Sequence, residues 1–331
     1  MRSKRIACTL AAALLLAHAS AAAPYSDVFL FGDSLSDTGN TCALLEIPGY
    51  ASGRCSNGPV WSDRLAEALG FEALPSSQLG NNFADGGDET SDLDLQIDLF
   101  QTLQIGPFGD ADPDALYVLW LGGNDVLSMP GAPGAMAQAV ERLLAGIERL
   151  RSLGARHFLV ANLPDVGRVF GAFSFPQGSG SAFTPGERDL VTALSLEFDA
   201  ALAAGLDSLE GVDVALLDVY GLMEEAVADP AAFGFSPAAI DTSSGDTAFG
   251  LPCLGDPACA TDPQGPGADG FLLFDSIHPS RALHAHVAER AVLLLPEPAP
   301  RTLRGLALLL VWLCRSSRSG QPGGRPRMAS S

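Results

Sequence analysis

Short apolar runs that end in polar or glycine-rich turns alternate, along most of this chain, with amphipathic segments of helical period. Such runs are typical of strands buried on both faces of a parallel sheet. The predicted strands are residues 25–31, 81–84, 114–121, 157–161 and 212–217. The predicted helices are residues 60–69, 91–103, 135–153, 185–209 and 279–295. This alternation predicts an α/β fold, a three-layer α/β/α sandwich around a mostly parallel five-stranded sheet.

The two ends of the chain have the pattern of processing signals. Residues 1–23 combine three basic residues, an apolar core and an Ala-rich end, as a secretory signal peptide does. Residues 296–331 begin with Pro-Glu-Pro, continue with an apolar run over residues 305–314 and end in a basic segment. This order resembles the PEP-CTERM sorting signal of Gram-negative bacteria. The resemblance implies export, a sorting protease of the exosortase type as partner, and a final place outside the cell or at its envelope.

The alternative for residues 296–331 is an irregular C-terminal tail. In either case we expect one domain over residues 24–295. This region holds 38 of the 39 acidic residues and 10 of the 19 basic residues, so its formal charge is near −28. So negative a surface repels nucleic acids and anionic membranes. We therefore expect no nucleic-acid partner.

Four cysteines of this region lie in two pairs that are close in sequence, Cys42 with Cys55 and Cys253 with Cys259. In an exported protein such pairs predict two disulfides, each closing a loop rich in Gly and Pro. A zinc site is the alternative. Neither pair has the Cys-x2-Cys spacing, and no histidine lies near enough to complete a ligand set. The sequence therefore favours disulfides.

The first predicted strand runs into a polar turn, Gly-Asp-Ser-Leu-Ser-Asp-Thr-Gly-Asn, that begins at Gly32. Ligands of open α/β sheets bind at the carboxyl ends of the strands, where Ser34 lies. A serine in such a cluster more often belongs to a turn or caps a helix. Ser34 is therefore a candidate nucleophile that needs partners from elsewhere in the chain, whereas Ser36 is assigned to the polar turn or to the cap of the following helix.

Three other segments supply the residue types that acyl transfer by a serine requires. Asp275 and His278 precede the last predicted helix, and their spacing lets the carboxylate reach one imidazole nitrogen while the other nitrogen accepts the serine proton. Gly87 can offer a backbone N–H, and Asn124 a side-chain amide, to the oxyanion formed when the serine attacks an ester. Each residue alone also fits a solvated loop, a turn or a cap. Their conjunction favours a hydrolase.

These segments resemble, in order, the sequence blocks of GDSL-type esterases and lipases of the SGNH hydrolase superfamily. The matching segments are residues 31–40, 82–87, 122–125 and 275–279, and the resemblance spans about residues 27–292. It implies a flavodoxin-like sheet, with Ser34 as nucleophile, His278 as general base and Asp275 as its orienting partner. It further implies that Ser34, Gly87 and Asn124 donate to the oxyanion. Two departures, Phe274 in place of Trp and Cys55 in place of an aromatic residue, concern the shape of the substrate site.

The resemblance implies an exported carboxylic ester hydrolase that acts through an acyl-enzyme on Ser34. Its partner would be an ester substrate, whether a lipid, an acylated sugar or a small ester. No metal or organic cofactor is implied. Two alternatives stay open, an acyltransferase that uses the same triad and a catalytically silent surface-binding protein of the same fold.

Overall fold

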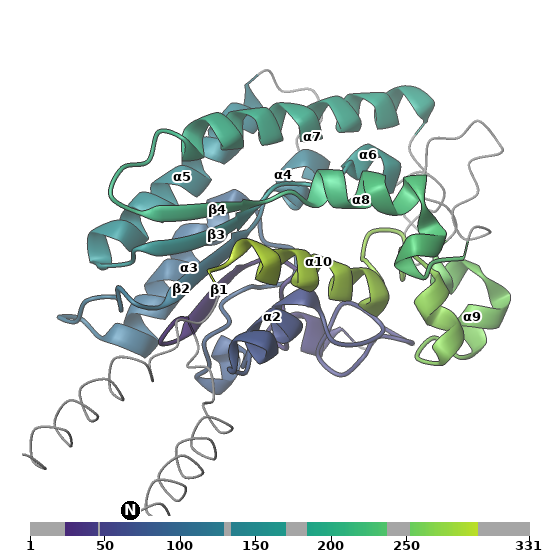
Figure 1. Ribbon diagram of the computed structural model, residues 1–331, viewed down its shortest axis with the longest axis horizontal. Helices are drawn as coiled ribbons and strands as arrows, with labels where there is room; N and C mark the ends of the chain where they lie inside the picture. The colour runs from purple at the N-terminus through teal and green to yellow at the C-terminus, as the bar shows by residue number, and fades with distance from the viewer. Residues whose placement is uncertain (1–23, 46, 129–133, 170–183, 237–251, 297–331) are drawn as a thin grey trace, which may run out of the picture. The chain divides into compact units, whose positions relative to one another are not determined.

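Four short strands pair in parallel, in the same order as they occur in the chain (Figure 1). The structure is a computed structural model that describes residues 24–45, 47–128, 134–169, 184–236 and 252–296. The strands are β1 (Val28–Gly32), β2 (Leu116–Trp120), β3 (His157–Ala161) and β4 (Asp213–Leu217). All residues of β1 and β2 are buried, as continuous apolar runs predict. The predicted parallel α/β arrangement is confirmed.

The predicted fifth strand, residues 81–84, is wrong as a strand of the sheet. In the described part of the chain this segment meets β1 through one isolated parallel bridge between Leu30 and Asn82. The Asn81 side chain donates to the carbonyl oxygen of Val28, where the N–H of a regular strand would donate. A side-chain hydrogen bond therefore replaces the start of the ladder. Because Leu30 also pairs with β2, the segment lies on the opposite side of β1, at the place of the second strand in a flavodoxin-like order.

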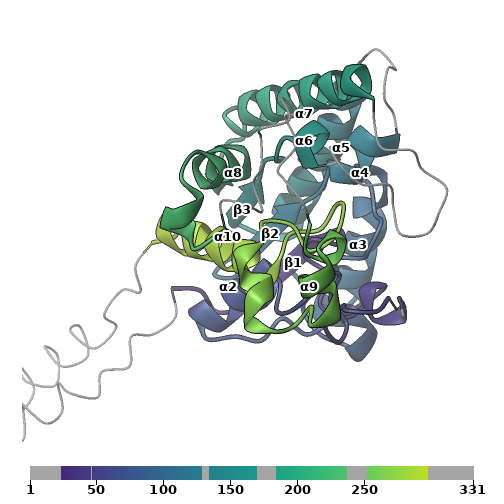
Figure 2. The same cartoon turned by 90° about the vertical axis from the view of Figure 1, so that its right-hand side faces the viewer.

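Helices cover both faces of the sheet (Figures 1 and 2). One face carries α3, α5 and α7, and the other carries α2, α8 and α10. The described α-helices are α2 (Trp61–Leu69), α3 (Leu93–Phe100), α4 (Gly123–Ser128), α5 (Ala135–Leu153), α6 (Val166–Val169), α7 (Pro185–Leu206), α8 (Val219–Ala228), α9 (Pro257–Thr261) and α10 (Arg281–Leu294).

Each face of the sheet has its own apolar core, because successive side chains of a strand point to opposite faces. Leu30 and Val118 pack in one core with residues of α2 and α10. Phe31 and Tyr117 pack in the other core with residues of α3, α5 and α7. Phe100 of α3 lies edge-on to both Phe31 and Tyr117. Both strands are therefore held from two sides, which fixes their carboxyl ends in space.

Two predictions of local structure need correction. The helix predicted over residues 91–103 ends as α3 at Phe100 and continues as a π-helical turn over Gln101–Ile105. The region 231–270 is rich in Pro, Gly and Asp, a composition that predicts an extended surface loop, but its described part contains α9 and short 3-10 helices. The side chain of Asp256 caps α9 by accepting from two backbone N–H groups, and a proline follows it at the first helical position. The signal-like and sorting-like ends, 1–23 and 297–331, lie outside the described residues.

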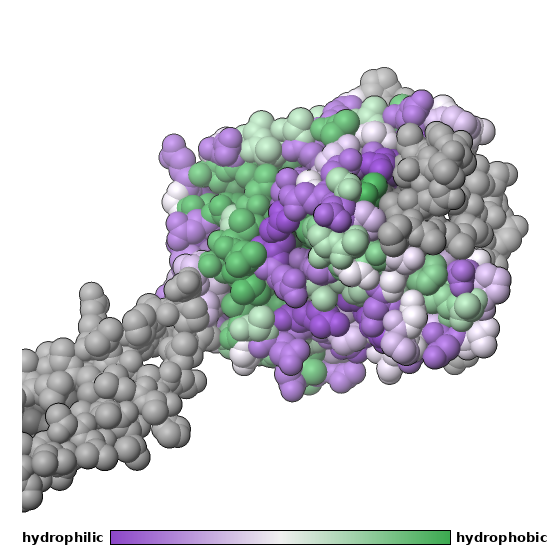
Figure 3. Space-filling model, turned by 45° about the vertical axis from the view of Figure 1, so that its right-hand side comes forward, coloured by the Kyte–Doolittle hydropathy of each residue, from purple (hydrophilic) through white to green (hydrophobic). Residues whose placement is uncertain are grey.

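The face drawn in Figure 3 mixes hydrophilic residues with a band of hydrophobic ones. Several large apolar side chains of the domain are exposed, among them Val292, Leu293 and Leu294 in the last turn of α10. Within the described residues, none of the helices is both long and apolar enough for a membrane span.

The packing of α5 against α3 yields a stability test. A Cβ added at Gly146 would lie 2.3 Å from Cδ2 of Leu93. We expect Gly146→Leu to lower the free energy of unfolding by about 1–3 kcal/mol, although leucine is the better helix former. Gly186→Leu in α7 is the matched control, because nothing lies within 4 Å of the added Cβ there. Urea denaturation of both variants measures the difference, and equal stabilities would contradict the close approach.

Candidate active site

Ser34 lies in the turn directly after β1, at the carboxyl edge of the sheet. The carbonyl oxygen of Asp33 accepts from the N–H groups of Ser36 and Asp37, which closes this turn around Ser34. Ser36 is buried, and its hydroxyl oxygen accepts from the indole N–H of Trp61. The neighbouring serine is therefore part of the scaffold, while the hydroxyl of Ser34 remains available to a partner.

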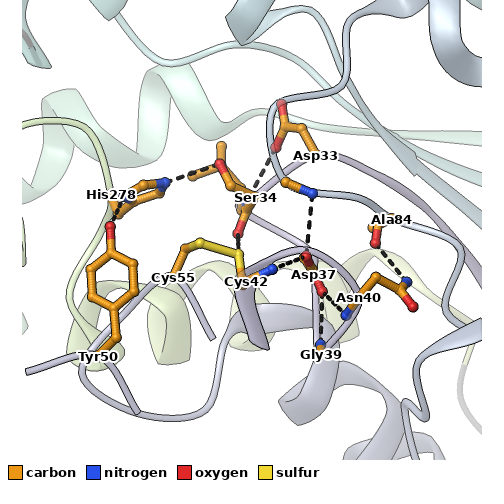
Figure 4. The surroundings of a disulfide bond; sticks show 12 residues. Asp33, Ser34, Asp37, Gly39, Asn40, Cys42, Tyr50, Cys55, Ala84 and His278 are labelled. Carbon is orange, nitrogen blue, oxygen red and sulfur yellow. Dashed lines mark hydrogen bonds between the residues drawn. A yellow bond between two sulfur atoms is a disulfide. The ribbon is translucent and has the colours of Figure 1, made fainter. Parts of the chain in front are cut away.

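The Ser34 hydroxyl meets His278, which lies just before α10 (Figure 4). Ser34 Oγ is 3.0 Å from His278 Nε2. On the other side of the ring, His278 Nδ1 is 2.9 Å from Oδ2 of Asp275. The structure therefore brings the serine, the imidazole and the carboxylate into one line of hydrogen bonds, from positions at opposite ends of the domain. With the proton on Nδ1, Nε2 can accept the proton of the serine.

The Asp275 carboxylate is buried, and its surroundings keep it ionised. Burial alone would raise its pKa, but the attraction of His278 and hydrogen bonds from His278, Tyr50 and the N–H of Ile277 outweigh burial and hold the pKa below its usual value. The N–H of His278 also donates to Oδ1, at 2.8 Å. A charged carboxylate therefore faces Nδ1 of the imidazole.

The two predicted oxyanion donors lie beside the serine. Gly87, Asn124, Ser34 and His278 all line one pocket of about 480 Å³. Gly87 has a φ of +97°, a conformation that favours glycine. Among the described residues, the N–H groups of Ser34 and Gly87 have no acceptor. The Asn124 amide donates to the carbonyl oxygen of Asp88, at 2.8 Å, which fixes the amide next to the Gly87 loop.

The loops that carry these donors are joined to the serine turn by Asp37. This buried carboxylate accepts from the N–H groups of Gly39, Asn40 and Cys42, and from Gly86 in the second loop (Figure 4). Asp37 therefore holds the Ser34 turn and the Gly86–Gly87 loop together, and the Asn82 side chain, which donates to the carbonyl oxygen of Ser36, adds a second link.

Two pockets meet at the serine and the imidazole. They share Ser34, Asn124, Leu127, Ile277 and His278. Beyond these, the first pocket is mostly apolar, with Leu35, Leu163, Pro164, Val166 and Val169 in its lining. The second pocket runs along the loop that follows Thr41. An ester bound across the serine could therefore place one part in each pocket.

Both predicted disulfides are present, Cys42–Cys55 and Cys253–Cys259. Cys42 Sγ lies 4.0 Å from the carbonyl oxygen of Ser34, so the first disulfide adjoins the nucleophile turn (Figure 4). No group of three or more His, Cys, Asp or Glu side chains suited to a metal ion occurs in the part of the chain that the structure describes.

Tyr50 also belongs to this site, but no sequence pattern indicates that it contacts Asp275. Its hydroxyl donates to Asp275 Oδ2 at 2.6 Å, although the two residues are 225 positions apart. The sequence shows a tyrosine in a long loop, and no spacing or periodicity relates that loop to Asp275. The pairing of Cys42 with Cys55 could have indicated that the loop is held in place, but not where its tyrosine points.

A family model described as GDSL-like Lipase/Acylhydrolase matches residues 28–291. The chain belongs to this family. That membership confirms the predicted GDSL-type resemblance. The four residue blocks that carried the prediction all lie within the matched range.

The relatives of this GDSL-family chain include a named esterase and a named acyltransferase. Esterase EstA of Pseudomonas aeruginosa is 30% identical over 90% of this chain, which spans about half (51%) of that protein. Phosphatidylcholine-sterol acyltransferase of Aeromonas hydrophila is 28% identical over 87% of this chain and 96% of that protein. A solved structure of a lipolytic G-D-S-L family protein from Veillonella parvula is 14% identical and covers 81% of this chain with a TM-score of 0.46.

Asp33, the neighbour of Ser34 in this GDSL-family chain, provides a pH test. Burial raises its pKa to about 7, against a weaker opposing effect of the Leu35 N–H. The folded protein therefore binds an additional proton between about pH 4 and 7, and Asp33 makes the fold more stable as pH falls through that window. We expect Asp33→Asn to raise the free energy of unfolding at pH 8, by up to about 4 kcal/mol, and to lose this advantage toward pH 4.

Denaturant unfolding between pH 4 and 8 measures this difference between variant and wild type. Asp110→Asn removes an exposed carboxylate and serves as the control. A difference between Asp33→Asn and wild type that is the same at every pH would contradict the burial effect.

Proposed function

We propose that this protein hydrolyses carboxylic esters with Ser34 as nucleophile, His278 as general base and Asp275 as the residue that orients the imidazole. The strongest support is the pair of hydrogen bonds on either side of the imidazole. Ser34 Oγ lies 3.0 Å from His278 Nε2, and His278 Nδ1 lies 2.9 Å from Oδ2 of Asp275. A serine hydroxyl is a weak nucleophile unless a base accepts its proton as it attacks. Here the base and its orienting carboxylate are both in hydrogen-bond range.

In the first step, Ser34 Oγ attacks the ester carbonyl carbon and its proton passes to His278 Nε2. The Asp275 carboxylate stabilises the imidazolium that forms, because its charge lies beside Nδ1. The imidazolium then gives the proton to the departing alkoxide oxygen. An alcohol leaves, and the acyl group stays on Ser34 as an ester.

The negative charge on the carbonyl oxygen needs donors that are already in place. The N–H groups of Ser34 and Gly87 and the amide of Asn124 are the donors we propose, since all three residues line the pocket at the serine. Removing one such donor typically raises the barrier by around 3 kcal/mol. The bonds through Asp37 and Asp88 keep these donors in position before the substrate arrives.

In the second step, a water molecule gives a proton to His278 Nε2 and attacks the acyl-enzyme. His278 then returns the proton to Ser34 Oγ, and a carboxylic acid leaves. The mainly apolar pocket beside Leu163 and Val166 has a volume of about 50 Å³, which suits a short hydrocarbon part of an ester. We propose that it holds the acyl chain and that the pocket on the Tyr50 side receives the alcohol part.

We further propose that the protein acts after export. Two disulfides in one domain are typical of oxidising compartments. Residues 1–23 have the pattern of a signal peptide, and residues 296–331 resemble a PEP-CTERM tail. The expected final location is outside the cell or at the envelope of a Gram-negative bacterium, after recognition of the tail by an exosortase-type protease.

Ser34→Ala tests the nucleophile. We expect hydrolysis of p-nitrophenyl esters to fall by up to about 10⁶-fold, since a triad without its serine retains little activity. Ser276→Ala is the control, because the Ser276 hydroxyl is buried next to Asp275 but has no hydrogen-bond partner among the described residues. It should keep wild-type activity. If the wild type hydrolyses the ester no faster than Ser34→Ala, the protein is a surface-binding protein and not an enzyme. Covalent labelling by a fluorophosphonate at another residue would exclude Ser34 as the nucleophile.

A second candidate function is acyl transfer, because the relative of which this chain covers 96% is named an acyltransferase. The reactions differ in whether water or an alcohol attacks the acyl-enzyme. We expect a hydrolase, so that with p-nitrophenyl butyrate and millimolar hexanol most of the acyl group appears as butyric acid. Gas chromatography of the products measures the ratio. Hexyl butyrate as the main product would instead assign the protein to the acyltransferases.

A further inference from the structure

Tyr50 contacts two of the three residues proposed for catalysis. Its hydroxyl oxygen is 2.6 Å from Asp275 Oδ2. The same oxygen is 3.1 Å from His278 Nδ1 (Figure 4). Its ring meets the His278 ring edge-on, with centroids 5.9 Å apart. The tyrosine therefore lies against the side of the imidazole that faces away from Ser34.

The chemistry of the three groups gives these hydrogen bonds a direction. The hydroxyl has one proton, and the charged Asp275 carboxylate accepts it at the shorter distance. Burial, and then the nearby charge of Asp275, raise the pKa of Tyr50 well above its ordinary value, so the hydroxyl keeps that proton. The lone pairs of its oxygen are then free to accept from Nδ1–H of His278. Tyr50 thus bridges the carboxylate and the imidazole and favours the form of His278 whose Nε2 is unprotonated.

The loop that carries Tyr50 is held at several points. The Cys42–Cys55 disulfide closes it, and Gln264 donates to the carbonyl oxygen of Tyr50 at 3.2 Å. The Tyr50 ring packs against Phe274, the residue before Asp275, with centroids 5.6 Å apart. Phe274 in turn lies in a small core with both cysteines of the second disulfide. The tyrosine is therefore fixed in relation to Asp275 from two directions.

We propose that Tyr50 is a positioning residue of the active site, that it holds the Asp275–His278 pair in its working geometry, and that the Cys42–Cys55 disulfide maintains Tyr50 there. This inference rests on the proposed esterase function. Tyr50 contacts the pair on the side away from Ser34, so it acts through Asp275 and His278 and not on the ester.

Tyr50→Phe keeps the ring and removes the hydroxyl. We expect kcat to fall by about tenfold, the size of one hydrogen bond to a charged group, with KM little changed. The acid limb of the kcat/KM profile should move to higher pH, because Asp275 loses one of the donors that hold its pKa down. Two other ionisable groups interact with the charge of His278, Asp33 and the buried His284, and Tyr50→Phe leaves both side chains in place.

Tyr117→Phe is the matched control. Tyr117 is also a buried tyrosine with a bonded hydroxyl, which donates to the carbonyl oxygen of Asp112 far from the site. Its removal should leave kcat and the pH profile unchanged. Thermal unfolding of both variants checks that each is folded.

The role of the disulfide is tested by a double-mutant cycle. In a Cys42→Ser/Cys55→Ser background the Tyr50 loop loses the disulfide that closes it, so Tyr50→Phe should lower kcat by clearly less than tenfold. An equal tenfold loss with and without the disulfide would overturn the role of the disulfide.

Full activity of Tyr50→Phe with an unmoved pH profile would overturn the positioning role. So would a fall in activity with an unmoved profile, since it would show that the hydroxyl only supports the fold. Failure of the esterase function itself has a different signature, because wild type and Tyr117→Phe would then be as inactive as Ser34→Ala.

Discussion

The buried carboxylate of Asp275 is a charge withdrawn from water, and it is stable only where donors surround it. The N–H groups of Ile277 and His278 supply two donors, the imidazole Nδ1–H a third and the Tyr50 hydroxyl a fourth. Each donor has to point at the carboxylate. That requirement fixes the turn from Asp275 to His278, the orientation of the ring and the path of the Tyr50 loop, and it directs Nε2 toward Ser34.

The other half of the site depends on the carboxyl end of β1. Strand β1 is buried between two apolar cores, so the turn that follows it has a fixed origin. Gln96 of α3 clamps this end, because its side chain both accepts from and donates to the backbone of Gly32. Asp37 then connects the turn to the loop of Gly87. Ser34, the proposed nucleophile, and the proposed oxyanion donors therefore share one scaffold, and a substrate would meet groups that are already oriented.

Much of the fold could be predicted because it is encoded over short distances. The helix over residues 135–153 has the predicted bounds, since its apolar positions recur with the helical period and a glycine ends it. The segment 81–84 is not a strand of the sheet, because the Asn81 side chain donates to the carbonyl oxygen of Val28. In a regular strand that carbonyl would accept from a backbone N–H. Helix α8 was not predicted, although Asp218 caps it directly after β4.

The sequence by itself determined the reactive residue types and the contacts within one turn. Asp275 and His278 are three residues apart, and each disulfide closes a short loop, so a few backbone dihedrals suffice to bring these partners together. The tertiary structure decided which distant residues contact these local features. The contact of Ser34 with His278, the two pockets and the approach of Tyr50 to Asp275 all join distant parts of the chain. No periodicity or spacing encodes such contacts, because they follow from how the loops pack on the edge of the sheet.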